Sequence, residues 1–93
     1  MKEKDFSKLL YSAVVTLENE DECKHLFEDL CTPKEIKSIA QRFAVAKMLS
    51  EGKVYNDIIE KTGASTATIS RVSRTMSKGS MTVLERLGKT KNV

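Results

Sequence analysis

The chain has 93 residues, of which 40% are hydrophobic and 31% are charged. This length holds one small domain, and the composition is that of an ordered, water-soluble protein. No run of about 18 apolar residues could span a membrane, and the N-terminus lacks the apolar stretch of a secretion signal. Cys23 and Cys31 are too few for a disulfide framework, so we expect reduced thiols and a cytoplasmic location.

Charge is divided unevenly along the chain. Residues 1–31 contain four Lys or Arg and eight Asp or Glu, a net charge of −4. Residues 32–93 contain twelve and five respectively, a net charge of +7. A basic segment of this kind suits a polyanionic partner such as nucleic acid, although a solvated basic face is an equally simple interpretation.

The N-terminal third predicts two helices. The first, over residues 4–18, is indicated by a stripe at helical spacing that consists of Phe6, Leu9, Leu10, Ala13, Val14 and Leu17. An acidic break follows, and the second helix is predicted over 20–30, with Cys23, Leu26, Phe27 and Leu30 on one side. Because a lone domain of this size is marginally stable, these helices favour association with a second copy.

A strong local signal marks the start of a third helix. Thr32 can cap it, Pro33 suits the first helical position, and Glu35 completes a capping box. We predict that this helix runs to about Ser50 and ends before Gly52 in the left-handed conformation. Its expected buried residues are Ile36, Ile39, Ala40, Phe43 and Leu49.

Two further helices are predicted on either side of a tight turn at residues 63–65. The first covers 56–62, and the second covers 66–77, with Ser65 as its cap and Gly79 ending it. A last short helix is expected over 82–87, where Thr82 could begin a capping box. The sequence shows no β-type alternation, so we predict an all-α fold with about six short helices.

The segment 53–78 is typical of a helix-turn-helix. Its first helix would bury Ile58, Ile59 and Thr62, and its second would bury Ile69, Val72 and Met76. The opposite face of the second helix carries small residues early and basic residues late: Ala67, Ser70, Arg71, Arg74 and Lys78. Small side chains let a recognition helix approach base edges, and hydroxyls and arginines can bind bases or phosphates.

The pattern therefore predicts a protein that binds double-stranded DNA, and on a dimer two such helices would address the two halves of a palindromic site. The predicted DNA-binding residues are Asn56, Asp57, Thr66, Ala67, Thr68, Ser70, Arg71, Arg74 and Lys78. In this hypothesis Thr66, Ala67 and Ser70 approach base edges. Arg71, Arg74 and Lys78 hold phosphates, with a guanine as the alternative target of Arg74.

Two alternatives belong to other functional classes. The basic face could bind an acidic partner protein, or the regulator could respond to a small ligand. An enzyme is not expected, because the single histidine, His25, has no converging titratable partners. No metal is expected either, since Cys23, His25 and Cys31 do not have a familiar zinc spacing.

Two motifs resemble the Trp repressor superfamily, and most closely its YerC/YecD-type branch. They read DLCTPKEIKSIAQRFAVAKMLSEGK and IIEKTGASTATISRV, and together they cover most of residues 29–75. The resemblance implies an intertwined all-α homodimer whose N-terminal helices interlock. It also implies that the protein is a bacterial transcriptional regulator that acts as a repressor. The implied organisation is a single domain over 1–93, with dimerisation helices at 1–31, the helix-turn-helix at 53–78, and a C-terminal helix and tail at 79–93.

The resemblance also bears on a ligand pocket. The superfamily's repressor sandwiches its corepressor, L-tryptophan, between two arginines that match Arg42 and Arg71, and Thr32 and Thr68 match pocket-lining positions. This sequence departs at Val72, where the tryptophan-binding member has Gly, and at Thr75, where it has Ser. Extra volume in a packed site is costly, so we expect no cofactor and no tryptophan corepression. The sequence does not identify any small-molecule effector.

Overall fold

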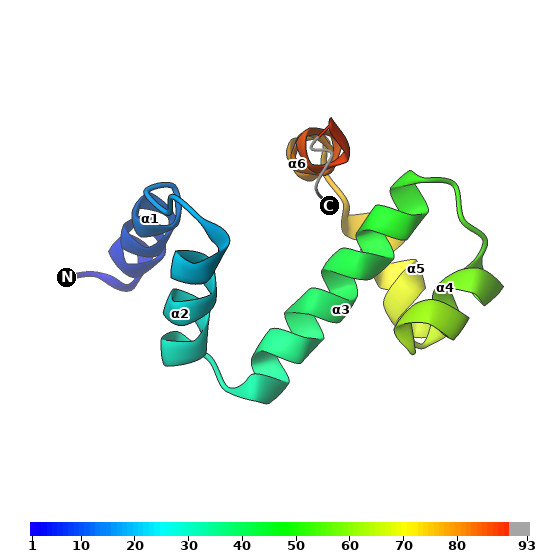
Figure 1. Cartoon of the computed structure of the whole chain (residues 1–93), viewed down its shortest axis with the longest axis horizontal. Helices are drawn as coiled ribbons and strands as arrows, with labels where there is room; N and C mark the ends of the chain where they lie inside the picture. The colour runs from blue at the N-terminus through cyan, green and yellow to red at the C-terminus, as the bar shows by residue number, and fades with distance from the viewer. Residues whose placement is uncertain (90–93) are drawn as a thin grey trace. The chain divides into compact units, whose positions relative to one another are not determined.

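The structure is a computed structural model that describes residues 1–89, with side chains described for 1–88. Within this range it has no strand and six helices: α1 (Glu3–Val14), α2 (Glu20–Leu30), α3 (Pro33–Ser50), α4 (Tyr55–Thr62), α5 (Thr66–Thr75) and α6 (Lys78–Lys89) (Figure 1). The prediction of an all-α chain with about six helices is confirmed. The end of the predicted tail, residues 90–93, lies outside the described residues.

The chain divides into two compact units, residues 1–36 and 37–93, which α3 joins as one continuous helix. The first unit holds α1, α2 and the first turn of α3, and the second holds the remaining helices. None of the helices in residues 1–89 has both the length and the apolar content needed to cross a membrane.

Helix α1 ends four residues earlier than predicted. The hydroxyl of Thr16 donates a hydrogen bond of 2.7 Å to the carbonyl oxygen of Ala13. A threonine hydroxyl that binds a nearby carbonyl offers the backbone an alternative to further helix. The chain turns at this point, so Leu17 lies beyond the helix and the predicted end at residue 18 is wrong.

The N-terminal unit has no core of its own. Asn19 caps α2 by accepting a hydrogen bond of 2.9 Å from the Glu22 N–H, yet no residue of α1 or α2 is buried. Phe6 is 54% exposed and Leu9 is 59% exposed, and Leu30 at the end of α2 is 62% exposed. Apolar surface of this extent is unusual in a monomer and typical of an interaction surface.

The predicted capping box at the start of α3 is confirmed. The Thr32 N–H donates to a Glu35 carboxylate oxygen at 2.8 Å, and the Glu35 N–H donates to the Thr32 hydroxyl at 3.1 Å. The backbone hydrogen bond from Thr32, reinforced by its hydroxyl, lowers the pKa of Glu35 below its usual 4.5. At the other end, Gly52 has φ = 78°, which confirms the predicted left-handed glycine after the helix.

This lowered pKa predicts an acid-dependent loss of stability that Glu35→Gln should reduce. Because the folded pKa is lower than the unfolded one, the stabilisation is complete above 4.5 and disappears as the pH falls through the folded pKa. Glutamine keeps the capping hydrogen bond but does not titrate. Thermal unfolding at neutral pH and at about pH 3 should therefore show a smaller acid effect in the variant. An equal acid effect in both proteins would contradict the prediction.

The core lies in the second unit and is formed by four of its helices and one turn residue. Its buried residues are Val45 and Ala46 of α3, Ile58 of α4, Ala64 of the turn, Ile69 and Val72 of α5, and Leu84 of α6. This core joins α3 to both helices of the helix-turn-helix, so it determines the side of α3 against which α4 and α5 pack.

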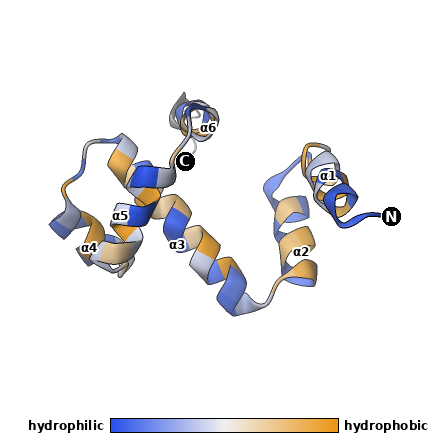
Figure 2. Ribbon diagram, turned by 180° about the vertical axis from the view of Figure 1, so that it is seen from behind, coloured by the Kyte–Doolittle hydropathy of each residue, from blue (hydrophilic) through white to orange (hydrophobic). Residues whose placement is uncertain are grey.

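Most of the predicted buried face of α3 is not buried. Ile39 is 48% exposed, Phe43 is 44% exposed, Ala40 is also exposed, and Ile36 is only partly buried. Leu49 is the exception, since it is partly buried and packs against the core. Val45 lies nine residues after Ile36 and therefore on the opposite side of the helix. Apolar residues recur along the length of α3 (Figure 2), and their positions place them on more than one side, so periodicity alone did not identify the side that packs within the chain.

The boundary between α5 and α6 also differs from the prediction. The Ser77 hydroxyl accepts a hydrogen bond of 3.2 Å from the Ser80 N–H, so α6 begins at Lys78 and includes Gly79 in its first turn. Gly79 therefore does not end α5, which stops at Thr75. The predicted start at Thr82 is wrong as well, because the Thr82 hydroxyl donates to the carbonyl oxygen of Lys78 inside the helix.

Candidate nucleic-acid interface

Helices α4 and α5 pack together through a tight turn. Gly63 has φ = 73°, and its N–H donates to the carbonyl oxygen of Ile59 at 2.9 Å. The Thr62 hydroxyl donates to the carbonyl oxygen of Ile58 at 2.7 Å and accepts from the Ala64 N–H at 3.1 Å. The left-handed conformation suits glycine, and the structure has the predicted helix-turn-helix arrangement.

One face of α5 is held against the core. Ser65 caps the helix as predicted, since its hydroxyl accepts from the Thr68 N–H at 3.1 Å. Ile69 is completely buried and Val72 is 7% exposed, and Met76, just after the helix, is partly buried. Ile58 of α4 is buried opposite them, so the predicted inward face is confirmed.

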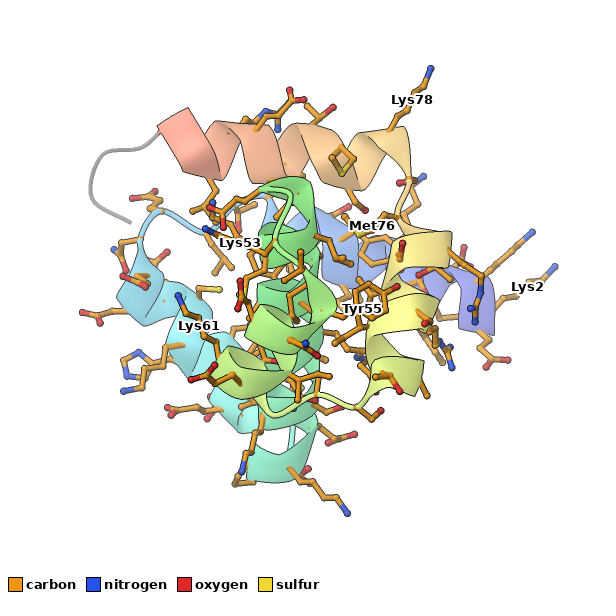
Figure 3. All side chains as sticks on the ribbon, turned by 90° about the vertical axis from the view of Figure 1, so that its right-hand side faces the viewer. Lys2, Lys53, Tyr55, Lys61, Met76 and Lys78 are labelled. Carbon is orange, nitrogen blue, oxygen red and sulfur yellow. The ribbon has the colours of Figure 1, made fainter. Side chains whose placement is uncertain are left out.

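The outward face of α5 is polar and basic. Ala67, Arg71 and Arg74 are exposed, and Ser70 is half-buried. Lys78, which was predicted to follow this face directly, instead belongs to the first turn of α6, where its side chain extends away from the helix (Figure 3). Within α5, small residues therefore precede the two arginines, as a helix that enters a groove requires.

Only some of the hydroxyls of α5 are free to bind a partner. The Thr68 hydroxyl lies 3.1 Å from the Ser65 hydroxyl, and the Thr75 hydroxyl reaches the carbonyl oxygen of Val72 at 3.5 Å. In the described part of the chain, the side chains of Thr66, Ser70 and Ser73 make no hydrogen bond to another residue. These three hydroxyls can therefore donate to or accept from a ligand.

The first turn of α4 presents the two other predicted contact residues. Asn56 and Asp57 are both exposed and stand at the N-terminal end of the helix. The N–H groups of a first helical turn attract an anion such as phosphate. The Asp57 carboxylate opposes that attraction, so Asn56 is the better placed of the two to meet a phosphate.

The arginines of α5 keep their charge available. Neither Arg71 nor Arg74 forms an ion pair with any described residue. By contrast, Lys47 Nζ lies 3.0 Å from Glu51 Oε2 at the end of α3, and the hydrogen bond from Lys47 lowers the pKa of Glu51. These two unpaired arginines are thus on the same helix as the free hydroxyls.

A hollow of about 680 Å³ lies among α3, α5 and α6. Five of the six predicted pocket residues line it: Arg42, Thr68, Arg71, Val72 and Thr75. Thr32 does not line it, and its hydroxyl is used in the α3 capping box. Val72 packs into the hydrophobic core, so its side chain already occupies one wall of the hollow.

Sequence reasoning missed the contribution of α6 to this hollow. Ser80, Val83 and Leu84 line it, and Leu84 is only 4% exposed. In the sequence, this contribution was indicated only by the adjacent apolar residues Val83 and Leu84, in a segment that was predicted to be a shorter helix. The helix begins earlier because Ser77 caps it. Gln41 also lines the hollow, and nothing in its sequence context indicated a role.

The comparisons with known proteins agree with this geometry. A family model described as Trp repressor protein matches residues 6–90. The uncharacterized protein YerC of Bacillus subtilis (strain 168) is 51% identical over 70 residues, which are 75% of this chain and 67% of YerC.

Two solved structures are similar to this chain. A candidate Trp repressor from Staphylococcus aureus has a TM-score of 0.84 and 43% identity, covering 92% of this chain and 89% of the other. A TrpR-like protein from Eubacterium eligens ATCC 27750 has a TM-score of 0.82 and 52% identity, covering 90% of each chain. The similarity therefore extends well beyond the helix-turn-helix.

Proposed function

Since the chain belongs to the Trp repressor family, we propose that it is a sequence-specific regulator of transcription that binds double-stranded DNA through α4 and α5. We propose further that it represses, and that it acts in the bacterial cytoplasm without catalysing a reaction. The observation that carries the proposal is the division of α5 into a buried face, Ile69 and Val72, and an exposed face of small, hydroxyl and basic residues.

The exposed face of α5 suits the major groove. Thr66 and Ala67 stand in its first turn and Ser70 in its second, where short side chains let the helix approach base edges. The free hydroxyls of Thr66 and Ser70 can serve either donor or acceptor atoms of bases. Arg71 and Arg74 follow, with long side chains that reach phosphates or, for Arg74, a guanine.

We propose that the functional unit is a homodimer. Neither α1 nor α2 buries any residue in the single chain, although α1 carries the exposed side chains of Phe6, Leu9 and Leu10. A second copy would remove this apolar surface from water, which is favourable in proportion to the area covered. Two copies of α5 would then read half-sites about 34 Å apart, which requires a palindromic operator.

We propose that L-tryptophan does not control this regulator. Val72 is 7% exposed and belongs to the core, so an indole at its place would meet an occupied volume. Overpacking of a filled site typically costs about 1–3 kcal/mol. Arg42 and Arg71 still line the hollow, so a measured response to tryptophan would overturn this part of the proposal.

Selection of bound duplexes from a random DNA pool tests the proposed function. We expect enrichment of a palindromic site that is bound about a thousandfold or more above random DNA, with no change when L-tryptophan is added. Binding without enrichment that disappears at moderate salt would show charge attraction alone. That result would reject sequence-specific regulation and favour an acidic protein partner.

Arg74→Ala should weaken binding of the selected site by about 1–3 kcal/mol for each guanine that Arg74 reads, and it should reduce selectivity at that base pair. Arg74 is exposed in the last turn of α5, so removing it should leave the fold intact. Titrations with the selected duplex and with duplexes altered at single base pairs give both quantities.

Lys78→Ala is the charge-matched control for Arg74→Ala. Lys78 is exposed at the start of α6, and we expect its removal to weaken binding of all sequences by a similar factor. If Arg74→Ala behaved in the same uniform way, Arg74 would bind a phosphate and would not read bases.

A further inference from the structure

One side chain of α3 holds the turn that presents α5. We propose that Gln41 is a positioning residue, which fixes the turn between α4 and α5 and thereby the approach of α5 to DNA. This inference rests on the proposed DNA-binding function. Gln41 is partly buried, and its Nε2 donates a hydrogen bond of 3.0 Å to the carbonyl oxygen of Thr62.

The accepting carbonyl needs such a partner. Thr62 is the last residue of α4, and the final carbonyl groups of a helix have no partner within the helix. Gly63 turns the chain away from the helix axis at this point with φ = 73°. Gln41 therefore satisfies a carbonyl that the turn would otherwise leave without a protein donor.

This hydrogen bond supplies direction that the core contacts lack. Val45 and Ala46 of α3 meet the helix-turn-helix through apolar contacts, which are not directional. A hydrogen bond restricts both distance and angle. The hydrogen bond from Gln41 to Thr62 joins positions 21 apart in the chain. The other side-chain hydrogen bonds described in residues 1–88, those of Arg86 not considered, join positions at most four apart.

Only three residues separate Thr62, which the Gln41 hydrogen bond holds, from the start of α5 at Thr66. The Thr62 hydroxyl accepts from the Ala64 N–H, and Ala64 is 2% exposed. Ser65 follows and caps α5. Thr66 and Ala67, which we propose approach the bases, come directly next. We therefore expect a shift of the Thr62 carbonyl to displace the first turn of α5, which holds Thr66 and Ala67, more than the rest of the helix.

Gln41→Met tests this inference. Methionine has a similar length and good helix propensity but cannot donate a hydrogen bond. In the DNA-free protein we expect amide hydrogen exchange at Gly63 and Ala64 to become about tenfold faster, the size of effect that removing one neutral hydrogen bond gives. With DNA, we expect the ratio of affinities for selected and random duplexes to fall by about tenfold.

Two further variants make the test selective. Ser38→Ala, one turn earlier on α3 and also beside the hollow, should change neither quantity. Gln41→Lys keeps a side-chain N–H donor and should retain slow exchange, which separates a missing donor from a disturbed helix. All measurements are made well below the melting temperatures of the variants, so that global unfolding does not contribute to exchange.

The outcomes separate this inference from the function on which it rests. Unchanged exchange in Gln41→Met, or faster exchange with an unchanged affinity ratio, would overturn the positioning role while wild-type selectivity remained. If the wild-type protein selected no DNA site, the proposed function itself would fail. The exchange rates alone would then decide whether Gln41 holds the turn.

Discussion

Ala67→Phe should abolish selective DNA binding while leaving the fold intact. Ala67 is exposed in the first turn of α5, so the larger side chain disturbs no packed neighbour and costs at most about 0.5 kcal/mol in helix propensity. At a base edge the same ring would prevent close approach. Failure to read one base pair typically costs about 1–3 kcal/mol, and the proposed dimer would bear that cost at both half-sites, so affinity for the selected site should fall about a hundredfold or more.

The measurement is a titration of the selected and random duplexes, with thermal unfolding as the check on the fold. Ala67→Ser, which stays small, should bind nearly as the wild type does. Binding to an acidic protein by charge attraction would tolerate the phenyl ring. If Ala67→Phe kept its selectivity for the DNA site, α5 would not enter the groove by its first turn, and the arrangement proposed for Thr66 and Ser70 would be wrong.

Leu9→Glu should dissociate the proposed dimer and unfold the N-terminal helices. Leu9 is 59% exposed in the single chain and lies on the apolar stripe of α1. If a second copy covers this stripe, the variant places a carboxylate in an apolar interface, which costs several kcal/mol when the charge is unpaired. Because α1 and α2 bury no residue within the chain, they should lose helical structure when the partner leaves.

Sedimentation equilibrium and circular dichroism measure the two effects together. Ser12→Glu is the matched control, since it adds the same charge to α1 outside the apolar stripe and at an exposed position. It should remain dimeric and helical. A monomeric wild-type protein, or a Leu9→Glu variant as dimeric as the control, would reject the proposed dimer interface.

The composition of α5 is explained by what its two faces do. Threonine and serine are mediocre helix formers because their hydroxyls compete for backbone groups, and half of the ten residues of α5 are of these two types. The Ser65 cap and the burial of Ile69 and Val72 offset this weakness. The helix can therefore present free hydroxyls at Thr66, Ser70 and Ser73 without depending on its intrinsic propensity.

The local features of this fold could be predicted from the sequence alone. The capping box of Thr32 and Glu35, the Ser65 cap and the left-handed Gly52 all appear where the residue pattern placed them. Each depends on hydrogen bonds or dihedral angles within a few residues, which residue type and spacing specify directly. The inward face of the helix-turn-helix followed from helical periodicity in the same way.

Tertiary structure decided what local patterns left open. Helix α3 carries apolar residues on more than one side, and only packing against α4, α5 and α6 selected Val45 and Ala46 over Ile39 and Phe43. The link from Gln41 to Thr62 spans 21 positions, and no local pattern indicates such a pair. Sequence periodicity identifies the faces of a helix, but which face meets which partner depends on interactions between residues far apart in the chain.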